Sequence, residues 1–387
     1  MKIDTSSWAK VTLGDIAQSL TIATKDPLSE GLERYVGLEH IEPGNIHIKS
    51  WGNVADGTTF TRVFSKGQVL FGKRRAYQKK AAMAEFDGIC SGDILVCEAI
   101  KDAVLPELLP FIVQSDRFFE HAIKTSAGSL SPRTKFKDLA KFTFKLPAKP
   151  IDQKRIADLL WSIDDTEQKQ SVLIEKMQDA KQTIIDNSLF DSKDKNLELN
   201  AIGEVVRGVT FSPSDIVSAE SDNKVLILRA NNIGSNIINY DDIIFVKKKR
   251  VSEIQVLKAR DFAICMSSGS KTLLGKTAEY LEHSGREIAV GAFCSIYRLE
   301  KDSAYFDMVK YYFQSSIYRK QVSLLLSGSN INNLKKSDIL GLCVPMASNM
   351  ENEIAKLQKI DTKILFLYEQ KKRLREIKTQ IINQIFG

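Results

Sequence analysis

Residues 151–190, IDQKRIADLLWSIDDTEQKQSVLIEKMQDAKQTIIDNSLF, contain neither proline nor glycine and repeat apolar residues in steps of three and four. This spacing places the apolar side chains on one face of a helix, and its heptad form is typical of a helix that pairs with another helix. The stretch therefore predicts one long helix. Its predicted pairing residues are Ile156, Leu159, Ile163, Leu173, Met177 and Ile184.

The end of the chain, residues 350–387, repeats this pattern, with apolar residues seven apart at Ile360, Leu367, Leu374 and Ile381. We expect the two helices to pair through these residues. Residues 151–190 hold 5 Lys or Arg and 8 Asp or Glu, whereas residues 350–387 hold 8 and 5. Opposite net charges favour the pairing, although imbalances this small also arise by chance.

The segments outside the two helices also repeat, in the same order and at a nearly constant offset. Leu13–Ile16 (LGDI) is echoed by Ile202–Val205 (IGEV), and Gly128-Ser129 by Gly328-Ser329. A duplicated unit with a few loop insertions produces such a pattern. The predicted organisation is a first globular domain, a first helical region, a second globular domain and a second helical region, at residues 1–150, 151–195, 196–349 and 350–387.

The globular domains mix strand-like and helical segments. Residues 141–146 alternate polar and apolar side chains and end at Pro147, and residues 340–344 end likewise at Pro345. An aromatic-rich helical segment precedes each of them, at 108–123 and 306–326. Such a mixture predicts an α+β fold, here with two globular α/β domains joined by two long helices.

Composition limits the class of protein. A chain of 387 residues with 43% hydrophobic residues can bury two cores, and its net charge of +7 favours an acidic partner such as nucleic acid. Five cysteines without a Cys-x-x-Cys pair and four scattered histidines predict neither a disulfide framework nor a metal site. No stretch approaches the roughly 18 apolar residues of a membrane span, so we expect a cytoplasmic protein.

One candidate for DNA binding is the run Lys73–Lys80, which carries five cations beside a tyrosine. Such a loop can neutralise phosphates, and arginine can read guanine edges, although a solvated turn has the same composition. The matching stretch, residues 266–278, differs in composition but keeps the Lys-x-Ala ending, as two readers of different half-sites would require. The predicted contacts in the two loops are Lys73, Arg74, Arg75, Tyr77, Lys79, Lys80, Ser268, Ser270, Lys271 and Lys276.

A second candidate is the Gly-Ser loop before the last strand of each domain, at residues 126–135 and 327–335. Small polar side chains and exposed backbone donors suit phosphates, and asparagine can pair with adenine. Ordinary turn chemistry explains the same residues equally well. The predicted contacts are Ser129, Arg133, Lys135, Ser329, Asn330, Asn332, Asn333 and Lys335.

Motifs for catalysis are missing from the sequence. The stretch Gly269–Thr277 is one residue too long for a phosphate-binding P-loop, and no amino-methyltransferase, nuclease or helicase motif is found. We therefore expect no catalytic residue and no bound cofactor in this chain.

Taken in order, these motifs resemble the specificity subunits of Type I restriction-modification systems. The resemblance covers essentially the whole chain and rests on the repeated openings, on Lys66–Leu70 (KGQVL), on the Gly-Ser loops, and on Leu146-Pro147 and Val344-Pro345, each of which leads into a helix. Where the family usually has Glu-Gln at the start of these helices, this chain has Asp152-Gln153 and Glu351-Asn352. That departure concerns only local contacts at the helix starts.

The resemblance implies a non-catalytic subunit in which two target recognition domains alternate with two helices that pack as an antiparallel coiled coil. Such a subunit recognises an asymmetric bipartite DNA target. It would scaffold two methyltransferase subunits and restriction or translocase subunits, which bring S-adenosylmethionine, ATP and Mg²⁺. Two alternatives stay open: a self-contained DNA methyltransferase or nuclease, and a coiled-coil scaffold that does not contact DNA.

Overall fold

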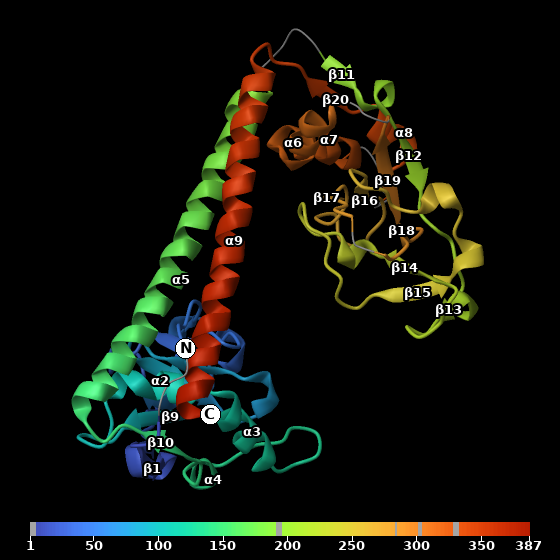
Figure 1. Ribbon diagram of the computed structural model, residues 1–387. Coiled ribbons are helices and arrows are strands. Elements are labelled where there is room, and N and C mark those ends of the chain that lie inside the picture. The colour runs from blue at the N-terminus through green and yellow to red at the C-terminus, as the bar shows by residue number, and fades with distance from the viewer. Residues whose placement is uncertain (1–4, 191–195, 283–284, 301–303, 328–332) are drawn as a thin grey trace. The chain divides into compact units, whose positions relative to one another are not determined.

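The computed structural model describes residues 5–190, 196–282, 285–300, 304–327 and 333–387. The chain divides into two compact units, Met1–Val172 with Leu367–Gly387, and Leu173–Phe366. Two long helices, α5 (Pro150–Ile184) and α9 (Met350–Phe386), each contribute one half to each unit (Figure 1). We call the two compact units unit 1 (Met1–Val172 with Leu367–Gly387) and unit 2 (Leu173–Phe366). Among the described residues, no helix is both long enough and apolar enough to cross a lipid bilayer.

Each unit contains an inner antiparallel sheet of four strands, and the strand order is the same in both. In unit 1 the order is β2-β9-β6-β7, formed by β2 (Ala17–Leu20), β6 (Val69–Gly72), β7 (Ala81–Met83) and β9 (Ile94–Ala99). In unit 2 the order is β12-β19-β16-β17, formed by β12 (Gly203–Arg207), β16 (Phe262–Cys265), β17 (Thr277–Glu279) and β19 (Cys294–Leu299). The shared order confirms the predicted internal duplication.

An outer sheet of four strands lies on one face of each inner sheet. In unit 1 its order is β4-β3-β8-β5, formed by β3 (Arg34–Val36), β4 (Gly52–Asn53), β5 (Arg62–Phe64) and β8 (Gly88–Cys90). In unit 2 its order is β13-β15-β14-β18, formed by β13 (Ile216–Val217), β14 (Lys224–Leu228), β15 (Ile244–Lys247) and β18 (Ile288–Val290). A parallel pair is common to both, β3 with β8 and β14 with β18, whereas the surrounding strands differ.

Short helices and a two-stranded sheet complete each unit. In unit 1 these are α1 (Leu13–Ile16), α2 (Leu109–Ile112), α3 (Asp116–Lys124), α4 (Phe136–Leu139), β1 (Ala9–Thr12) and β10 (Thr143–Leu146). In unit 2 they are α6 (Phe306–Gln314), α7 (Ser316–Ser327), α8 (Lys336–Leu340), β11 (Asn196–Glu198) and β20 (Cys343–Pro345). Strands β10 and β20 lie where the alternating stretches predicted them.

Alternation along the strands creates the layers, because successive side chains of a strand point to opposite faces. Val69 and Phe71 of β6 pack in the cluster that contains the helices, whereas Leu70 packs with the outer sheet. Phe262 and Ala263 of β16 separate in the same way. Each unit therefore has three layers, helices on the inner sheet and the inner sheet on the outer one.

The aromatic-rich segment of each unit is two helices rather than one. In unit 1 the break falls at Ser115, whose hydroxyl accepts from Phe118 N and donates to Ile112 O. In unit 2 Ser315 does the same with Tyr318 N and Tyr312 O. A serine hydroxyl that bonds both a carbonyl at the end of one helix and an N–H at the start of the next favours this sharp turn.

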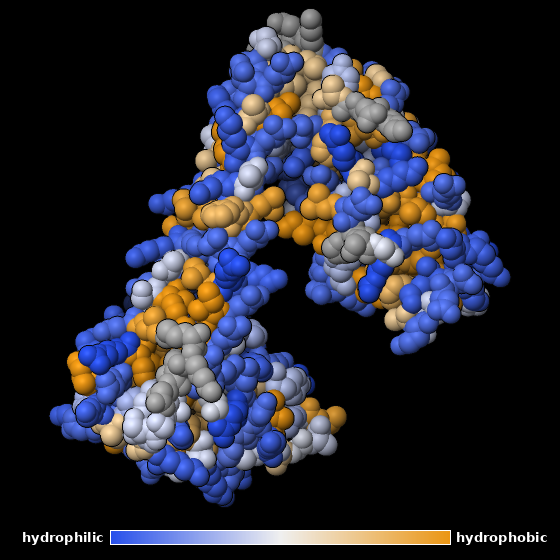
Figure 2. Space-filling view, viewed as in Figure 1, coloured by the Kyte–Doolittle hydropathy of each residue, from blue (hydrophilic) through white to orange (hydrophobic). Residues whose placement is uncertain are grey.

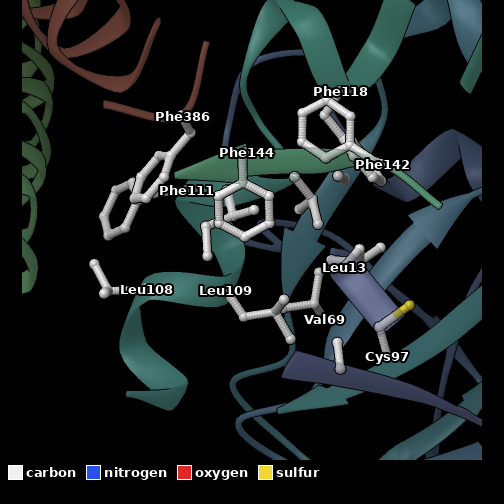
Figure 3. Packing of buried hydrophobic residues seen from close by; sticks show 14 of the residues in the cluster. Leu13, Val69, Cys97, Leu108, Leu109, Phe111, Phe118, Phe142, Phe144 and Phe386 are labelled. Carbon is white, nitrogen blue, oxygen red and sulfur yellow. The ribbon is translucent and has the colours of Figure 1, made fainter. Parts of the chain in front are cut away.

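The long helices pack into the core of unit 1 through aromatic rings. Phe386 of α9 lies against Phe144 of β10, with ring centroids 6.1 Å apart (Figure 3). Trp161 of α5 lies against Phe111 of α2 at 5.2 Å. The second half of α9 is therefore as much a part of this core as the first half of α5.

The pairing of α5 with α9 is antiparallel. Within unit 1, Glu167 contacts Arg375 and the earlier Asp164 contacts the later Lys378. Within unit 2, Lys181 forms an ion pair with Asp361 at 2.6 Å. Charged residues thus bridge the two helices in both units.

The buried face of α5 differs by one residue from the predicted one. Leu159 and Leu173 are 38% and 43% exposed, and Ile156, Ile163, Met177 and Ile184 are half-buried. The neighbouring stripe is buried instead, and it contains Gln153, Ala157, Leu160, Asp164, Glu167 and Ile174. On α9 the predicted residues are less exposed, since Leu367 is buried and Ile360, Leu374 and Ile381 are half-buried. The buried face of α5 differs from the predicted one because its contact with α9 includes the carboxylates Asp164 and Glu167. The spacing of apolar residues therefore indicated the adjacent face.

Candidate nucleic-acid interface

The two loops that were predicted to bind DNA in unit 1 lie side by side. One loop follows β6 and the other precedes α4. Thr134 N donates to Lys73 O at 3.0 Å, and Arg74 forms an isolated antiparallel β-bridge with Arg133. Two segments that are far apart in the sequence therefore form one surface.

Asp93, in the turn before β9, joins these loops. Arg133 Nε donates to Asp93 Oδ1 at 2.7 Å, and Arg74 Nη1 donates to Oδ2 at 3.0 Å. These bonds hold the pKa of Asp93 below its ordinary value, with Arg133 contributing most and burial opposing the shift. The carboxylate therefore stays ionised and fixes both guanidinium groups.

Cations outnumber carboxylates where the loops meet. Burial lowers the pKa of Lys73, and the like charges of Arg62 and Arg133 lower it further, while Asp93 opposes the shift. Arg75 adds another guanidinium, whose Nε is buried and has no hydrogen-bond partner among the described residues. This excess of positive charge favours an anion such as a DNA phosphate.

The tip of the first loop has an unusual backbone. Arg75 and Lys79 have φ angles of 53° and 52°, in the left-handed region that non-glycine residues seldom adopt. They flank a single 3₁₀ turn, Ala76–Gln78, which leaves Tyr77 56% exposed. Strain of this kind is common where a loop must present particular side chains to a ligand.

Two of the predicted lysines already have partners within the protein. Lys79 Nζ forms an ion pair with Asp116 at 2.6 Å, and Lys80 Nζ donates to Leu38 O at 2.6 Å. Lys79 and Asp116 are both about half exposed, so a phosphate could still reach the lysine. Of the other predicted residues in this unit, Ser129 and Lys135 are exposed.

In unit 2 the matching loops meet in the same way. Leu334 N donates to Met266 O at 2.8 Å, and Ser267 forms an antiparallel β-bridge with Asn333. The polar residues predicted to bind DNA around this contact are exposed or half-buried: Ser268, Ser270, Lys271, Lys276, Asn333 and Lys335. The predicted Ser329, Asn330 and Asn332 lie outside the described residues.

Comparison with known families gives a match to the first part of the chain. Residues 5–176 match the family model described as Type I restriction modification DNA specificity domain. The Type I restriction enzyme EcoKI specificity subunit of Escherichia coli (strain K12) is 32% identical over 179 residues, which is 46% of this chain and 38% of that protein. The StySPI specificity subunit of Salmonella potsdam is 34% identical over 179 residues, with the same coverage. The match thus spans well under half the length of these relatives.

Solved structures resemble the chain over nearly its full length. The Type I restriction-modification S subunit from M. genitalium gives a TM-score of 0.55 at 13% identity and covers 100% of this chain and 98% of that one. A chain from a type I R-M system, solved in work on complex assembly and conformational transition, gives 0.54 at 17% identity and covers 98% of both. At these identities the likeness is one of fold.

Proposed function

Since this chain belongs to the specificity-subunit family of Type I restriction-modification systems, we propose that it recognises an asymmetric bipartite DNA target and catalyses no reaction itself. The paired loops of unit 1 read one half of the target and those of unit 2 read the other. The recognition domains comprise residues 1–150 and 196–349.

The observation that carries this proposal is the pair of converging loops. In unit 1 they gather Lys73, Arg74 and Arg133 around the carboxylate of Asp93, and Arg75 follows in the same loop. Like charges gathered on one surface repel one another and lower the stability of the folded protein, and an anionic ligand offsets this repulsion. The recurrence of the same loop pair in unit 2 favours a ligand with two related halves, as DNA half-sites are.

The long helices serve, in this proposal, as the scaffold for two methyltransferase subunits and for restriction or translocase subunits. Apolar side chains are exposed on them, including Leu159 in unit 1 and Leu365 and Phe366 in unit 2. Figure 2 shows apolar residues at several places along the visible face of the long helices. Those partners supply S-adenosylmethionine, ATP and Mg²⁺.

Charge reversal tests the interface. In the complex with its methyltransferase partner, Arg75→Glu should weaken DNA binding by at least tenfold at about 0.1 M salt and reduce the slope of log affinity against log salt by about one. Fluorescence anisotropy with duplex DNA measures both quantities. Lys141→Glu is the matched control, because Lys141 is 74% exposed and lies outside the paired loops. Equal affinities for the two variants would contradict the proposal.

The same variants separate the alternatives. A scaffold that does not contact DNA should assemble with its partners and show no change in DNA association with Arg75→Glu. A self-contained methyltransferase should methylate DNA without the partner. The function proposed here requires that DNA is methylated by the complex and not by this chain without its partner. It also requires that one bipartite methyladenine motif disappears from the genome when the gene is deleted.

A further inference from the structure

The two interfaces share one backbone frame. Two backbone hydrogen bonds recur at matching places. In unit 1, Lys73 N donates to Asp93 O (2.9 Å) and Thr134 N donates to Lys73 O (3.0 Å). In unit 2, Met266 N donates to Phe293 O (2.9 Å) and Leu334 N donates to Met266 O (2.8 Å). The β-bridge between Arg74 and Arg133 likewise matches the bridge between Ser267 and Asn333. The frame therefore aligns three pairs of positions, Arg74 with Ser267, Asp93 with Phe293, and Arg133 with Asn333.

The side chains on this frame are chemically different. In unit 1 all three positions are charged, and Asp93 holds the guanidinium groups of Arg74 and Arg133, which are 37% and 47% exposed. Because Asp93 uses only some of their N–H groups, each arginine keeps donors that can point outward. Such fixed, donor-rich groups match the paired acceptors O6 and N7 of guanine.

In unit 2 none of the three positions is charged. Phe293 is 67% exposed, so its ring can make an apolar contact with a bound partner. Asn333 is exposed next to it in the frame, and Ser267 is half-buried. An asparagine amide matches the donor and acceptor of adenine, and an apolar ring matches the methyl group of thymine.

We infer that these three matched positions determine base preference, so that unit 1 reads a G·C pair at this place in its half-site and unit 2 reads an A·T pair. The inference rests on the proposed function and adds the residues and the bases to it. The shared backbone frame presents the three side chains of each unit to the DNA in the same way. The difference in base preference therefore comes from the side chains alone. Neither Asp93 nor Phe293 lies in a charged or otherwise distinctive stretch of sequence.

Transplanting one set onto the other unit tests this. The variant Ser267→Arg, Phe293→Asp and Asn333→Arg places the charged set on the frame of unit 2. Methyladenine mapping in cells that carry the methyltransferase partner then compares the recognised motif with that of the unchanged chain. We expect one half of the motif to exchange an A·T pair for a G·C pair while the other half is retained.

Single substitutions test the same inference and do not require the triple variant to fold. Asn333→Ala should relax discrimination at one A·T position by about tenfold to a hundredfold, measured with duplexes that differ at that position. Arg133→Ala should relax a G·C position in the other half to a similar extent. Lys141→Ala, outside the frame, should relax neither.

The possible results separate the inference from the proposed function. If the unchanged chain directs methylation of no bipartite motif, the proposed function fails. If it directs one, and Asn333→Ala and Arg133→Ala bind DNA with unaltered base preference in both halves, the function stands and the inference is overturned. Relaxation of both halves by either single variant would also overturn it, because each set would then not belong to one half-site.

Discussion

At the scale of single residues, His47 is held between two carboxylates. Its Nδ1 contacts Glu85, after β7, and its Nε2 contacts Asp164 of α5. A neutral imidazole donates from only one nitrogen, so two ionised carboxylates are both satisfied only by the imidazolium. The hydrogen bond with Asp164 is the main cause that raises the pKa of His47 above 6.5; burial opposes the shift, and Glu85 adds to it.

This arrangement predicts a pH dependence of unit 1. The imidazolium stabilises the folded chain fully below about pH 6.5, the ordinary histidine value, and that contribution is lost as pH rises through the higher folded pKa. Urea unfolding of unit 1, followed by hydrogen exchange of peptides from that unit, should show lower stability at pH 9 than at pH 6. His47→Gln should remove most of this difference.

His121 provides the control for the histidine prediction. Its Nε2 faces the backbone carbonyl of Asp138 at 2.8 Å, and a carbonyl accepts from a neutral ring as well as from a charged one. His121→Gln should therefore keep the pH dependence of the unchanged chain. A pH dependence that survives His47→Gln and vanishes with His121→Gln would refute this assignment.

Sequence reasoning predicts the cations of the proposed interface, but neither Asp93, which fixes two of them, nor Phe293 at the matching position of unit 2. Lys73–Lys80 is conspicuous because charges cluster in it, whereas Asp93 stands alone among neutral neighbours and Phe293 resembles any core residue. Their role depends on contacts between segments that are far apart in the sequence, namely the two loops and the turn before β9 or β19. Aligning the strands that begin at Ile94 and Cys294 would have paired Asp93 with Phe293 and suggested a comparison.

At the scale of elements, a buried charge cluster lies in the seam between α5 and α9. Lys378 Nζ donates to Asp164 Oδ1 at 2.7 Å and to Glu167 Oε2 at 2.8 Å, and all three residues are at most 5% exposed. Burial raises the pKa of Asp164 and Glu167, but their bonds to cations more than offset this and lower it overall. Arg375 adds a bond to Glu167 at 2.7 Å.

Removing the central cation should be costly. Lys378→Met leaves two carboxylates buried without their shared partner, and breaking a buried ion pair from one side costs roughly 3–5 kcal/mol. The midpoint of urea unfolding measures the loss. Lys372→Met changes an exposed lysine of the same helix and should shift the midpoint very little. A similar small shift for both variants would mean that the cluster contributes no net stability.

This cluster also explains which parts of the helix pair could be predicted. The two long helices and their pairing followed from apolar spacing, as at Leu367 and its neighbours. On α5 the seam contains Asp164 and Glu167, which a search for apolar residues passes over in favour of Leu159 and Leu173. Lys378 and Arg375 on the opposite helix, together with His47, reveal why carboxylates are tolerated there.

At the scale of the whole molecule, unit 1 is built from both ends of the chain. Its core includes Ile382, Ile385 and Phe386, which belong to the last turns of α9. Fully burying an apolar side chain of this size contributes about 1.5–3 kcal/mol. The core of unit 2, by contrast, is formed entirely by residues between 173 and 366.

Fragments should behave accordingly. Residues 1–172 alone should lose cooperative unfolding, because the three apolar side chains that close their core are missing. A peptide of residues 367–387 added in trans should restore part of the cooperativity, as followed by circular dichroism in urea. The same peptide with Ile382, Ile385 and Phe386 replaced by serine is the control and should restore none.

The discontinuous first unit also imposes an order on folding during synthesis. Unit 2 is complete once residue 366 has left the ribosome, but unit 1 waits for the final helix. At about 5–20 residues per second, the delay between residue 172 and the end of the chain is about 10 to 40 s. For that time residues 1–172 have to remain soluble with an unfinished core, so the segment that is made before unit 2 completes its fold after unit 2.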